Sequence, residues 1–217
     1  MIGPHAKLLR AELAAEYCSG LFSDELDQIG ERGRVVTGFL LNRCTHRMFG
    51  RARTVRLETV ETTDERIREG LGFLDRLNEG DVLLVEGSQE FAYFGELMSR
   101  MAMRRGLSGV VIDGLTRDTY FTTTIDLPLF ARGYSPVDIK GRGRVAAVDV
   151  DVTIGGLTVS PGDYVFGDND AVVLMKPARM PELLERVNRT AAREDLIKRH
   201  IASGMSVEEL LKVTSSF

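Results

Sequence analysis

The sequence predicts an α/β protein in which a mixed sheet is layered with helices. Short apolar segments at 82–86 and 109–113 alternate with segments of helical spacing, as in a parallel sheet that is covered on both faces. Beyond residue 140, apolar and polar residues alternate between glycine-containing turns, which predicts an antiparallel C-terminal half. The chain has 217 residues, of which 43% are hydrophobic, and can therefore bury one substantial core.

The first third of the chain predicts two short helices and then two strands. Leucine and alanine recur at helical spacing over residues 7–17, and Ser-Asp-Glu at 23–25 marks a second helix start. Residues 35–41 and 51–60 are rich in β-branched and apolar side chains, which is typical of strands. We therefore expect helices within about 7–30 and two strands joined by a loop.

The middle of the chain is expected to alternate between helix and strand. Thr62 and Glu65 form a capping box, which predicts a helix start. A compact apolar strand follows at 82–86, then a helix from about Gly95 to Arg105, then the strand at 109–113. The apolar residues after the capping box share one helical face: Ile67, Leu71, Leu74 and Leu77.

The C-terminal half predicts hairpins followed by helices. Residues 144–154 alternate like a strand, and the glycines at 155–156 supply a two-residue turn before further strands. An amphipathic helix is expected from Pro181 to His200. Ser206 and Glu209 then form the capping box of a last short helix.

Composition and charge exclude several classes of protein. The net charge of -4 and the pI near 5.5 argue against nucleic acid as a partner. No stretch approaches the roughly 18 apolar residues of a membrane span, so no membrane partner is expected. Cys18 and Cys44 are too few for a disulfide framework and suggest reduced thiols in a cytoplasmic protein. Without linkers or repeats, we expect a single domain with N-terminal helices at about 7–30 and C-terminal helices at about 180–213.

A charged segment, GVVIDGLTRD at 109–118, leads directly out of a buried strand. In open α/β sheets, ligands bind beyond the carboxyl ends of the strands, so Arg117 and Asp118 fall where a site is expected. The strand at 82–86 ends at the same edge and leads to Gly95 and a helix start. The first amides of a helix lack internal acceptors and can bind a carboxylate or phosphate.

These residue types suit a small oxo acid and a metal ion. Arg117 can bind a carboxylate through two hydrogen bonds, a charge-assisted contact that stabilises by about 1.5–3 kcal/mol. Asp118 suits Mg²⁺, which keeps several waters and needs only one or two protein carboxylates. An Arg-Asp pair after a strand is also typical of a structural salt bridge or a helix cap. Asp113 can orient the Arg117 loop or a water, or can form a turn, so its role stays open.

One spacing resembles a family signature. Glu96 is separated by 20 residues from Arg117 and Asp118, which resembles the acid-X20-Arg-Asp signature of the RraA-like family. That family includes class II pyruvate aldolases acting on 4-hydroxy-4-methyl-2-oxoglutarate. The resemblance implies the family's swivelling β/β/α fold. Further similar segments occur in the family's order: FGRARTV (49–55), GDVLLVEG (80–87), LPLFARGYSP (127–136) and GGLTVSPGDYVFGDNDAVV (155–173).

The resemblance implies a divalent-metal-dependent lyase that cleaves a C–C bond of a small 2-oxo acid. Arg117 is then expected to bind the carboxylate and the keto oxygen of the pyruvyl group. Gly95 allows close approach to the amides of Leu97 and Met98, which take the carboxylate. Asp118 is expected to hold Mg²⁺ or Mn²⁺.

The resemblance also implies catalytic acids and an assembly. The family aldolases usually carry Asp where this chain has Glu96, and they take a second acid from a neighbouring subunit, for which Glu194 is the candidate. A water positioned by the two acids removes a proton from the C4 hydroxyl as the C–C bond breaks. Decarboxylation of oxaloacetate passes through the same pyruvate enolate and needs a less exacting base. The implied assembly is a homotrimer or a hexamer with sites between subunits.

One alternative function accompanies this interpretation, and one motif is set aside. The family takes its name from a protein that inhibits RNase E, so a non-catalytic regulatory binding protein of the RraA type is the second hypothesis. The presence of Gly95, Arg117 and Asp118 favours the lyase. Cys44 and His46 resemble half of a zinc site, but no second pair follows at zinc spacing, so a structural or surface role is expected for them.

Overall fold

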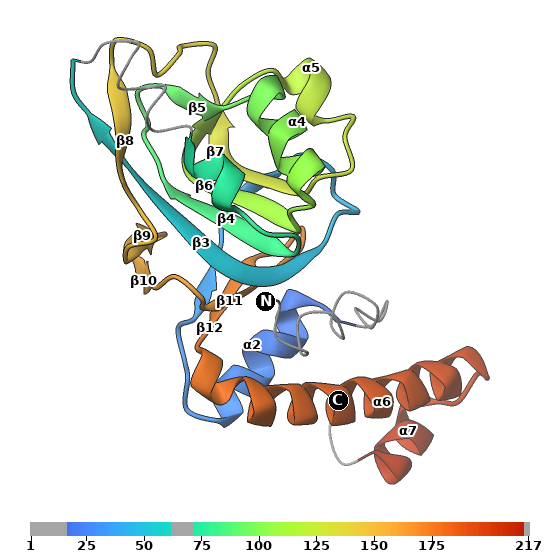
Figure 1. The fold of residues 1–217 in the computed structure, drawn as a ribbon. Helices are drawn as coiled ribbons and strands as arrows, with labels where there is room; N and C mark the ends of the chain where they lie inside the picture. The colour runs from blue at the N-terminus through green and yellow to red at the C-terminus, as the bar shows by residue number, and fades with distance from the viewer. Residues whose placement is uncertain (1–16, 62–71, 215–217) are drawn as a thin grey trace.

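A mixed sheet of ten strands dominates the computed structural model, which describes residues 17–61 and 72–214 (Figure 1). Two further strands form a separate hairpin. The strands are β1 (Val35–Val36), β2 (Leu40–Leu41), β3 (Met48–Thr59), β4 (Asp81–Glu86), β5 (Ala92–Phe94), β6 (Gly109–Thr116), β7 (Leu129–Tyr134), β8 (Gly143–Val148), β9 (Val152–Ile154), β10 (Leu157–Val159), β11 (Tyr164–Gly167) and β12 (Val172–Met175).

The sheet has the order β1-β12-β11-β3-β4-β6-β7-β2, with β5 beside β6 and β8 beside β3. Neighbours from β3 through β4 and β6 to β7 are parallel, whereas β8, β11 and β12 pair antiparallel. The predicted mixed sheet with an antiparallel C-terminal half is therefore confirmed. The helices are α2 (Ser19–Gln28), η1 (Gly72–Arg76), α4 (Glu96–Arg105), α5 (Thr119–Thr122), η2 (Pro177–Arg179), α6 (Met180–Ala202) and α7 (Val207–Val213).

Strand β4 shows why the central segments are apolar throughout. Its side chains alternate between two cores: Leu83 and Val85 face the layer of η1 and α4, while Val82 and Leu84 face the other side. Both faces are covered, as predicted. On the second face, however, the described residues of the core come from strands, among them β9, β10 and β12, and not from helices. This gives the β/β/α layering.

A third core lies beneath the β11–β12 end of the sheet, where α2 and α6 pack (Figure 1). Phe22 of α2 lies 4.8 Å from Phe166 of β11 between ring centroids. Glu25 of α2 accepts hydrogen bonds from Arg186 and Thr190 of α6 at 2.7 and 2.6 Å. Apolar packing and a hydrogen-bonded ion pair thus join α2, near the start of the described chain, to α6, near its end.

The bounds of two predicted strands were wrong, and one strand was missed. Residues 35–41 form two short strands that pair with different neighbours, β12 and β7, because the chain bends at Gly38, whose φ is 78°. Residues 144–154 also divide, into β8 and β9, around Asp149 at φ 53°, which binds Arg53. The short strand β5 was not predicted. Much of the helix expected at 7–17 and the capping box at 62–65 lie outside the described residues.

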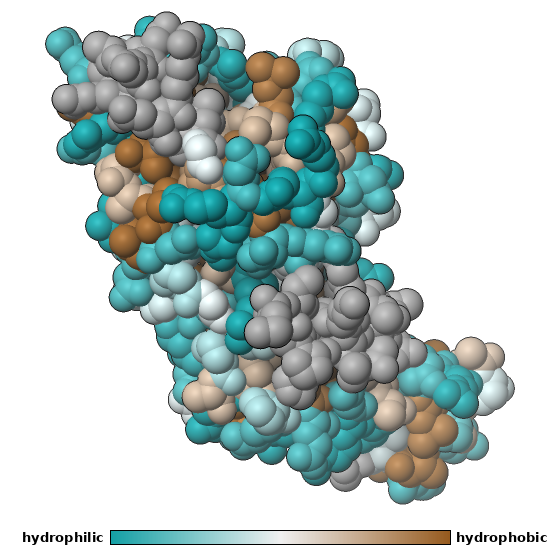
Figure 2. Space-filling view, in the orientation of Figure 1, coloured by the Kyte–Doolittle hydropathy of each residue, from teal (hydrophilic) through white to brown (hydrophobic). Residues whose placement is uncertain are grey.

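The C-terminal prediction is confirmed by α6 and by the capping box that starts α7. Only the first half of α6 is firmly packed, through Met180, Leu183, Val187 and Ala191. Beyond it, apolar side chains are exposed on α6 and α7, and Figure 2 shows apolar surface where α7 lies: Leu196, Ile201, Val207, Leu211 and Val213. No helix in the described ranges is both long and apolar enough to cross a bilayer.

Residues 42–47, between β2 and β3, pack against the segment that leads into β7. Asn42 Nδ2 donates hydrogen bonds to the carbonyls of Thr122 and Leu127 at 2.5 and 3.1 Å. His46 is buried on this loop. Burial is the main cause that lowers the pKa of His46, and the charge of Arg43 lowers it further, against a weaker opposite effect of Asp126. The imidazole is therefore neutral at neutral pH.

Candidate functional site

The start of α4 and the end of β6 meet in one hydrogen-bonded unit. The backbone N–H of Glu96 donates to Asp118 Oδ2 at 2.9 Å. Strand β5 brings them together, because Phe94 O accepts from Arg117 N at 3.0 Å and from Thr116 Oγ1 at 2.6 Å. The convergence of two neighbouring segment ends, expected from the sequence, is present.

Gly95 is required because the side chains of Arg117 and Asp118 lie close to its backbone. A Cβ atom at this position would lie 2.4 Å from Asp118 Oδ2 and 2.9 Å from Arg117 Cγ. Distances this short are not tolerated between non-bonded atoms, so any side chain would displace the two charged groups. Its φ of -153° is ordinary extended backbone, so space, rather than backbone conformation, selects glycine here.

Asp118 sits at the N-cap of α5 with φ 58°, a left-handed conformation that Asp and Asn tolerate better than other side chains. Its Oδ2 caps α4, while Oδ1 has no hydrogen-bond or ion-pair partner among the residues that the structure describes. One free carboxylate oxygen fits Mg²⁺ or Mn²⁺, because such ions complete their octahedra with water and substrate oxygens. The described part of the chain holds no group of three or more His, Cys, Asp or Glu suited to a metal.

Arg117 is held by Asp138, a residue that the sequence did not single out. Arg117 Nη1 lies 2.8 Å from Asp138 Oδ2, and its Nε lies 3.7 Å from Asp118 Oδ2. The loop that carries Asp138 is fixed because Ala92 N donates to Val137 O at 2.8 Å. Burial is the largest single cause and acts to raise the pKa of Asp138, but the hydrogen bonds and charges of Arg117 and Lys140 together outweigh it, so the pKa is lowered and the carboxylate stays ionised.

Glu96 has two partners on the surface of α4 and α5. Its Oε1 accepts from Arg100 Nε at 2.9 Å, and its Oε2 accepts from the Tyr120 hydroxyl. The Tyr120 hydrogen bond is the main cause that lowers the pKa of Glu96, and Arg100 adds to it. Tyr120 lies two residues after Asp118, so its place on α5 was within reach of sequence reasoning, but an exposed Tyr carries no local signal.

The amides expected to bind a carboxylate are available. The first intrahelical bond of α4 runs from Ser99 N to Gly95 O at 2.9 Å, so the N–H groups of Leu97 and Met98 have no acceptor within the helix. Leu97 is 76% exposed, which leaves the helix start open to solvent.

The side chain of Asp113 forms hydrogen bonds with neighbouring strands of the fold and not with Arg117. Its Oδ1 accepts from Arg132 Nε at 2.6 Å, and its Oδ2 accepts from Gly155 N at 2.6 Å. Asp113 thus ties β6 to β7 and to the β9–β10 turn. Of the roles left open for it, a structural role has direct support.

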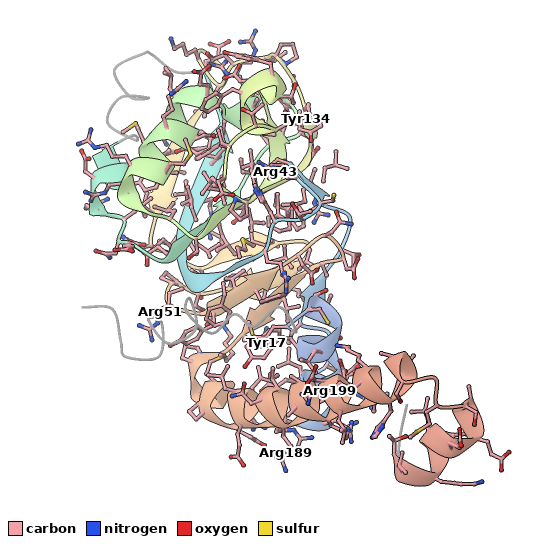
Figure 3. The ribbon with its side chains drawn as sticks, turned by 90° about the vertical axis from the view of Figure 1, so that its right-hand side faces the viewer. Tyr17, Arg43, Arg51, Tyr134, Arg189 and Arg199 are labelled. Carbon is pink, nitrogen blue, oxygen red and sulfur yellow. The ribbon has the colours of Figure 1, made fainter. Side chains whose placement is uncertain are left out.

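Glu194 does not join the site within one copy of the chain. It lies on α6 and pairs with Lys198 at 3.5 Å. Figure 3 shows Arg189 and Arg199, which flank Glu194 on α6, at the opposite end of the molecule from Tyr134. Tyr134 pairs with Thr116, the residue before Arg117. A role for Glu194 therefore requires a neighbouring subunit and stays a prediction.

The fold and this site define an α/β protein with an open helix start, an arginine and a free carboxylate oxygen at the carboxyl edge of its parallel strands. Comparison with protein families matches residues 21–174 to the RraA-like family, described as Aldolase/RraA. The chain belongs to this family.

Two curated relatives show the range of the family. "Protein DlpA" of Legionella pneumophila is 25% identical over 193 residues, which are 88% of this chain but 31% of DlpA. The chain thus spans less than a third of that relative. A Hahella chejuensis protein named "Putative 4-hydroxy-4-methyl-2-oxoglutarate aldolase" is 33% identical over 112 residues, or 50% of this chain and 68% of the relative.

A solved structure confirms the fold class. RraAS2 of Streptomyces coelicolor, described as an unusual member of the RNase ES inhibitor RraA protein family, superposes with a TM-score of 0.80. The superposition covers 91% of this chain and 98% of RraAS2 at 23% identity. This similarity establishes the architecture alone.

Proposed function

We propose that this protein is a divalent-metal-dependent lyase that releases pyruvate from a small 2-oxo acid. The reaction is a retro-aldol cleavage of 4-hydroxy-2-oxo acids, a decarboxylation of oxaloacetate, or both. The observation that supports it is the 2.9 Å hydrogen bond between Glu96 N and Asp118 Oδ2, which joins the helix start to the Arg-Asp pair. Relatives named as aldolases support the same reaction class.

The chain's own groups account for substrate binding. Asp138 occupies one N–H of Arg117 Nη1, and the rest of the guanidinium is left for the carboxylate and keto oxygen of the substrate. The amides of Leu97 and Met98 bind the same carboxylate from the helix start. Gly95 leaves room for this approach because it has no side chain.

Proton transfer is assigned to the acids. Glu96 is ionised at neutral pH, since Tyr120 and Arg100 lower its pKa, and it orients a water that accepts the C4 hydroxyl proton. Glu194 of a neighbouring copy is the proposed second acid. Asp118 is the proposed ligand of Mg²⁺ or Mn²⁺, which when bound draws electron density from the keto oxygen.

The assembly that this mechanism needs is a homotrimer or a hexamer. Glu194 lies on α6 beside α2, whereas Arg117 follows β6 at the other end of the molecule (Figure 1), so the second acid has to come from another copy. The exposed apolar side chains of Leu97 and Tyr120 beside the site, and of Leu196 and Ile201 on α6, are candidates for burial between copies.

The decisive experiment measures pyruvate release from oxaloacetate and from 4-hydroxy-2-oxo acids, with Mg²⁺, with Mn²⁺ and after chelation. We expect turnover only with metal. Replacing Arg117 with alanine should lower kcat/KM about 10- to 100-fold, because a charge-assisted pair is worth about 1.5–3 kcal/mol. Arg104→Ala, on the exposed part of α4, is the matched control and should retain activity. A folded, metal-supplied protein with no turnover would instead support the regulatory binding protein.

Asp138→Asn tests how Arg117 is positioned. The amide keeps the shape of the side chain but loses the charge that holds Arg117 Nη1 at 2.8 Å. We expect KM for the 2-oxo acid to rise about fivefold to tenfold, in line with about 1 kcal/mol for one lost interaction, while kcat changes less. Steady-state kinetics separate the two parameters. An unchanged KM would show that Asp138 does not orient Arg117.

A further inference from the structure

Asp118 and the helix α5 that follows it make three contacts with α4, and all of them bear on Glu96. The Asp118 carboxylate accepts a hydrogen bond from Glu96 N at 2.9 Å, and the Tyr120 hydroxyl donates to Glu96 Oε2. The ring of Phe121 lies against Arg100, with 4.3 Å between the ring centroid and Cζ. An exposed ion pair within one helix contributes little by itself. Here, however, a second segment holds the backbone and the side chain of Glu96 together.

These contacts leave one acceptor position on the Glu96 carboxylate. An ionised carboxylate offers about four acceptor positions, two on each oxygen. Arg100 Nε and Nη2 face Oε1 at 2.9 and 2.7 Å and occupy both positions there. The Tyr120 hydroxyl occupies one position on Oε2. Among the residues that the structure describes, no further donor reaches this carboxylate, so one position on Oε2 stays open.

The open position gives Glu96 one direction in which it can hold a water. A glutamate side chain has three torsions, and an untethered carboxylate would sample several rotamers. Arg100 and Tyr120 remove this freedom because they hold the two oxygens from different helices. Proton transfer requires heavy atoms within about 2.6–3.2 Å, so a fixed direction of the water is what a general base needs.

We propose that Tyr120 is a positioning residue for retro-aldol cleavage, an inference that rests on the lyase function proposed above. Its hydroxyl directs the open position of Glu96 Oε2 toward the water that serves the C4 hydroxyl of the substrate. The C4 hydroxyl proton passes to this water as the C3–C4 bond breaks. The electron pair of that bond enters the pyruvate enolate, and C4 becomes a carbonyl carbon. The proton then returns to C3, which completes pyruvate.

The two reactions differ in their need for this water. Oxaloacetate has no C4 hydroxyl, and its C3–C4 bond breaks as carbon dioxide leaves. The electron pair enters the same enolate, but no proton is removed at C4. The removal of the Tyr120 hydroxyl should therefore affect aldol cleavage more than decarboxylation. A general disturbance of Arg117 or Asp118 would instead affect both reactions.

The test is Tyr120→Phe in the full chain, with 4-hydroxy-4-methyl-2-oxoglutarate and oxaloacetate as the two substrates. The change removes one hydroxyl from a residue that is 74% exposed, so the melting temperature should stay at the parent value. We expect kcat for aldol cleavage, relative to kcat for decarboxylation, to fall about 10- to 100-fold at unchanged KM, because positioned acid–base catalysis contributes roughly 100- to 10,000-fold. Tyr164→Phe, the same change on β11, is the matched control and should keep the parent ratio.

A double-mutant cycle with Glu96→Asp tests the route of the effect. Aspartate is one methylene too short to meet the Tyr120 hydroxyl from the same backbone, so Tyr120→Phe should have no further effect in that background. Equal losses for both substrates, an unchanged aldol kcat, or additive effects in the cycle would overturn the positioning role. A parent that decarboxylates oxaloacetate but leaves the aldol substrate intact would overturn this role alone. Failure of the metal-supplied parent with both substrates would overturn the lyase function as well.

Discussion

Replacing Asp118 with asparagine should lower metal-dependent pyruvate release about 100- to 1000-fold, because a metal ion supplies several kcal/mol of transition-state stabilisation. The fold should survive. Asparagine tolerates the left-handed φ of 58°, and its side-chain oxygen can still accept the hydrogen bond from Glu96 N. Only the negative charge that is proposed to bind the cation is lost.

Pyruvate assays across a range of Mg²⁺ concentrations, together with thermal melts, measure this effect. Asp27→Asn, on the exposed side of α2, makes the same chemical change elsewhere and should have parent activity. Normal Mg²⁺-dependent turnover in Asp118→Asn would mean that Asp118 acts as a helix cap and not as a metal ligand.

Gly95→Ala should lower kcat/KM about 100-fold, since displacing catalytic groups by about 1 Å has effects of this size. The added methyl group would lie 2.4 Å from Asp118 Oδ2 and 2.9 Å from Arg117 Cγ, so both groups have to move. Overpacking should also reduce the free energy of unfolding by about 1–3 kcal/mol. Kinetics and urea unfolding measure the two effects.

Gly20→Ala in α2 is the control for Gly95→Ala. A Cβ at position 20 has Cys18 Sγ as its nearest neighbour, at an ordinary 3.8 Å. Alanine there should be neutral or stabilising by about 0.5–1 kcal/mol, because glycine is unfavourable inside a helix. If Gly95→Ala behaved like Gly20→Ala, the close packing around Asp118 would not be needed for function.

Much of the fold could be predicted because its signals are local. The apolar segments at 82–86 and 109–113 had to be buried strands, and both are, in β4 and β6. Capping chemistry placed the start of α7 correctly, with Ser206 and Glu209 bonded reciprocally. The boundary errors fell at Gly38 and Asp149, where a positive φ divides a pattern that is typical of one strand. A pattern of side chains does not reveal such a bend.

The residues of the candidate site also fall into two groups, those that the sequence predicted and those that it did not. Gly95, Arg117 and Asp118 were found from their places at segment ends, and the structure brings them together. Asp138 was missed because it lies about 20 residues after Arg117 in the sequence. Only the pairing of its loop with β5 brings the two side chains together. Sequence reasoning also could not decide where Glu194 lies relative to Arg117.

The sequence alone determined most of the segments that become strands and helices and which charged residues leave the core, because both follow from the spacing of neighbouring residues. Only the tertiary structure decided which charges meet. Asp138 reaches Arg117, and Asp126 reaches His46, across chain separations that carry no periodic signal. The physical reason is that these contacts depend on sheet order and loop closure, which are set by packing of the whole core.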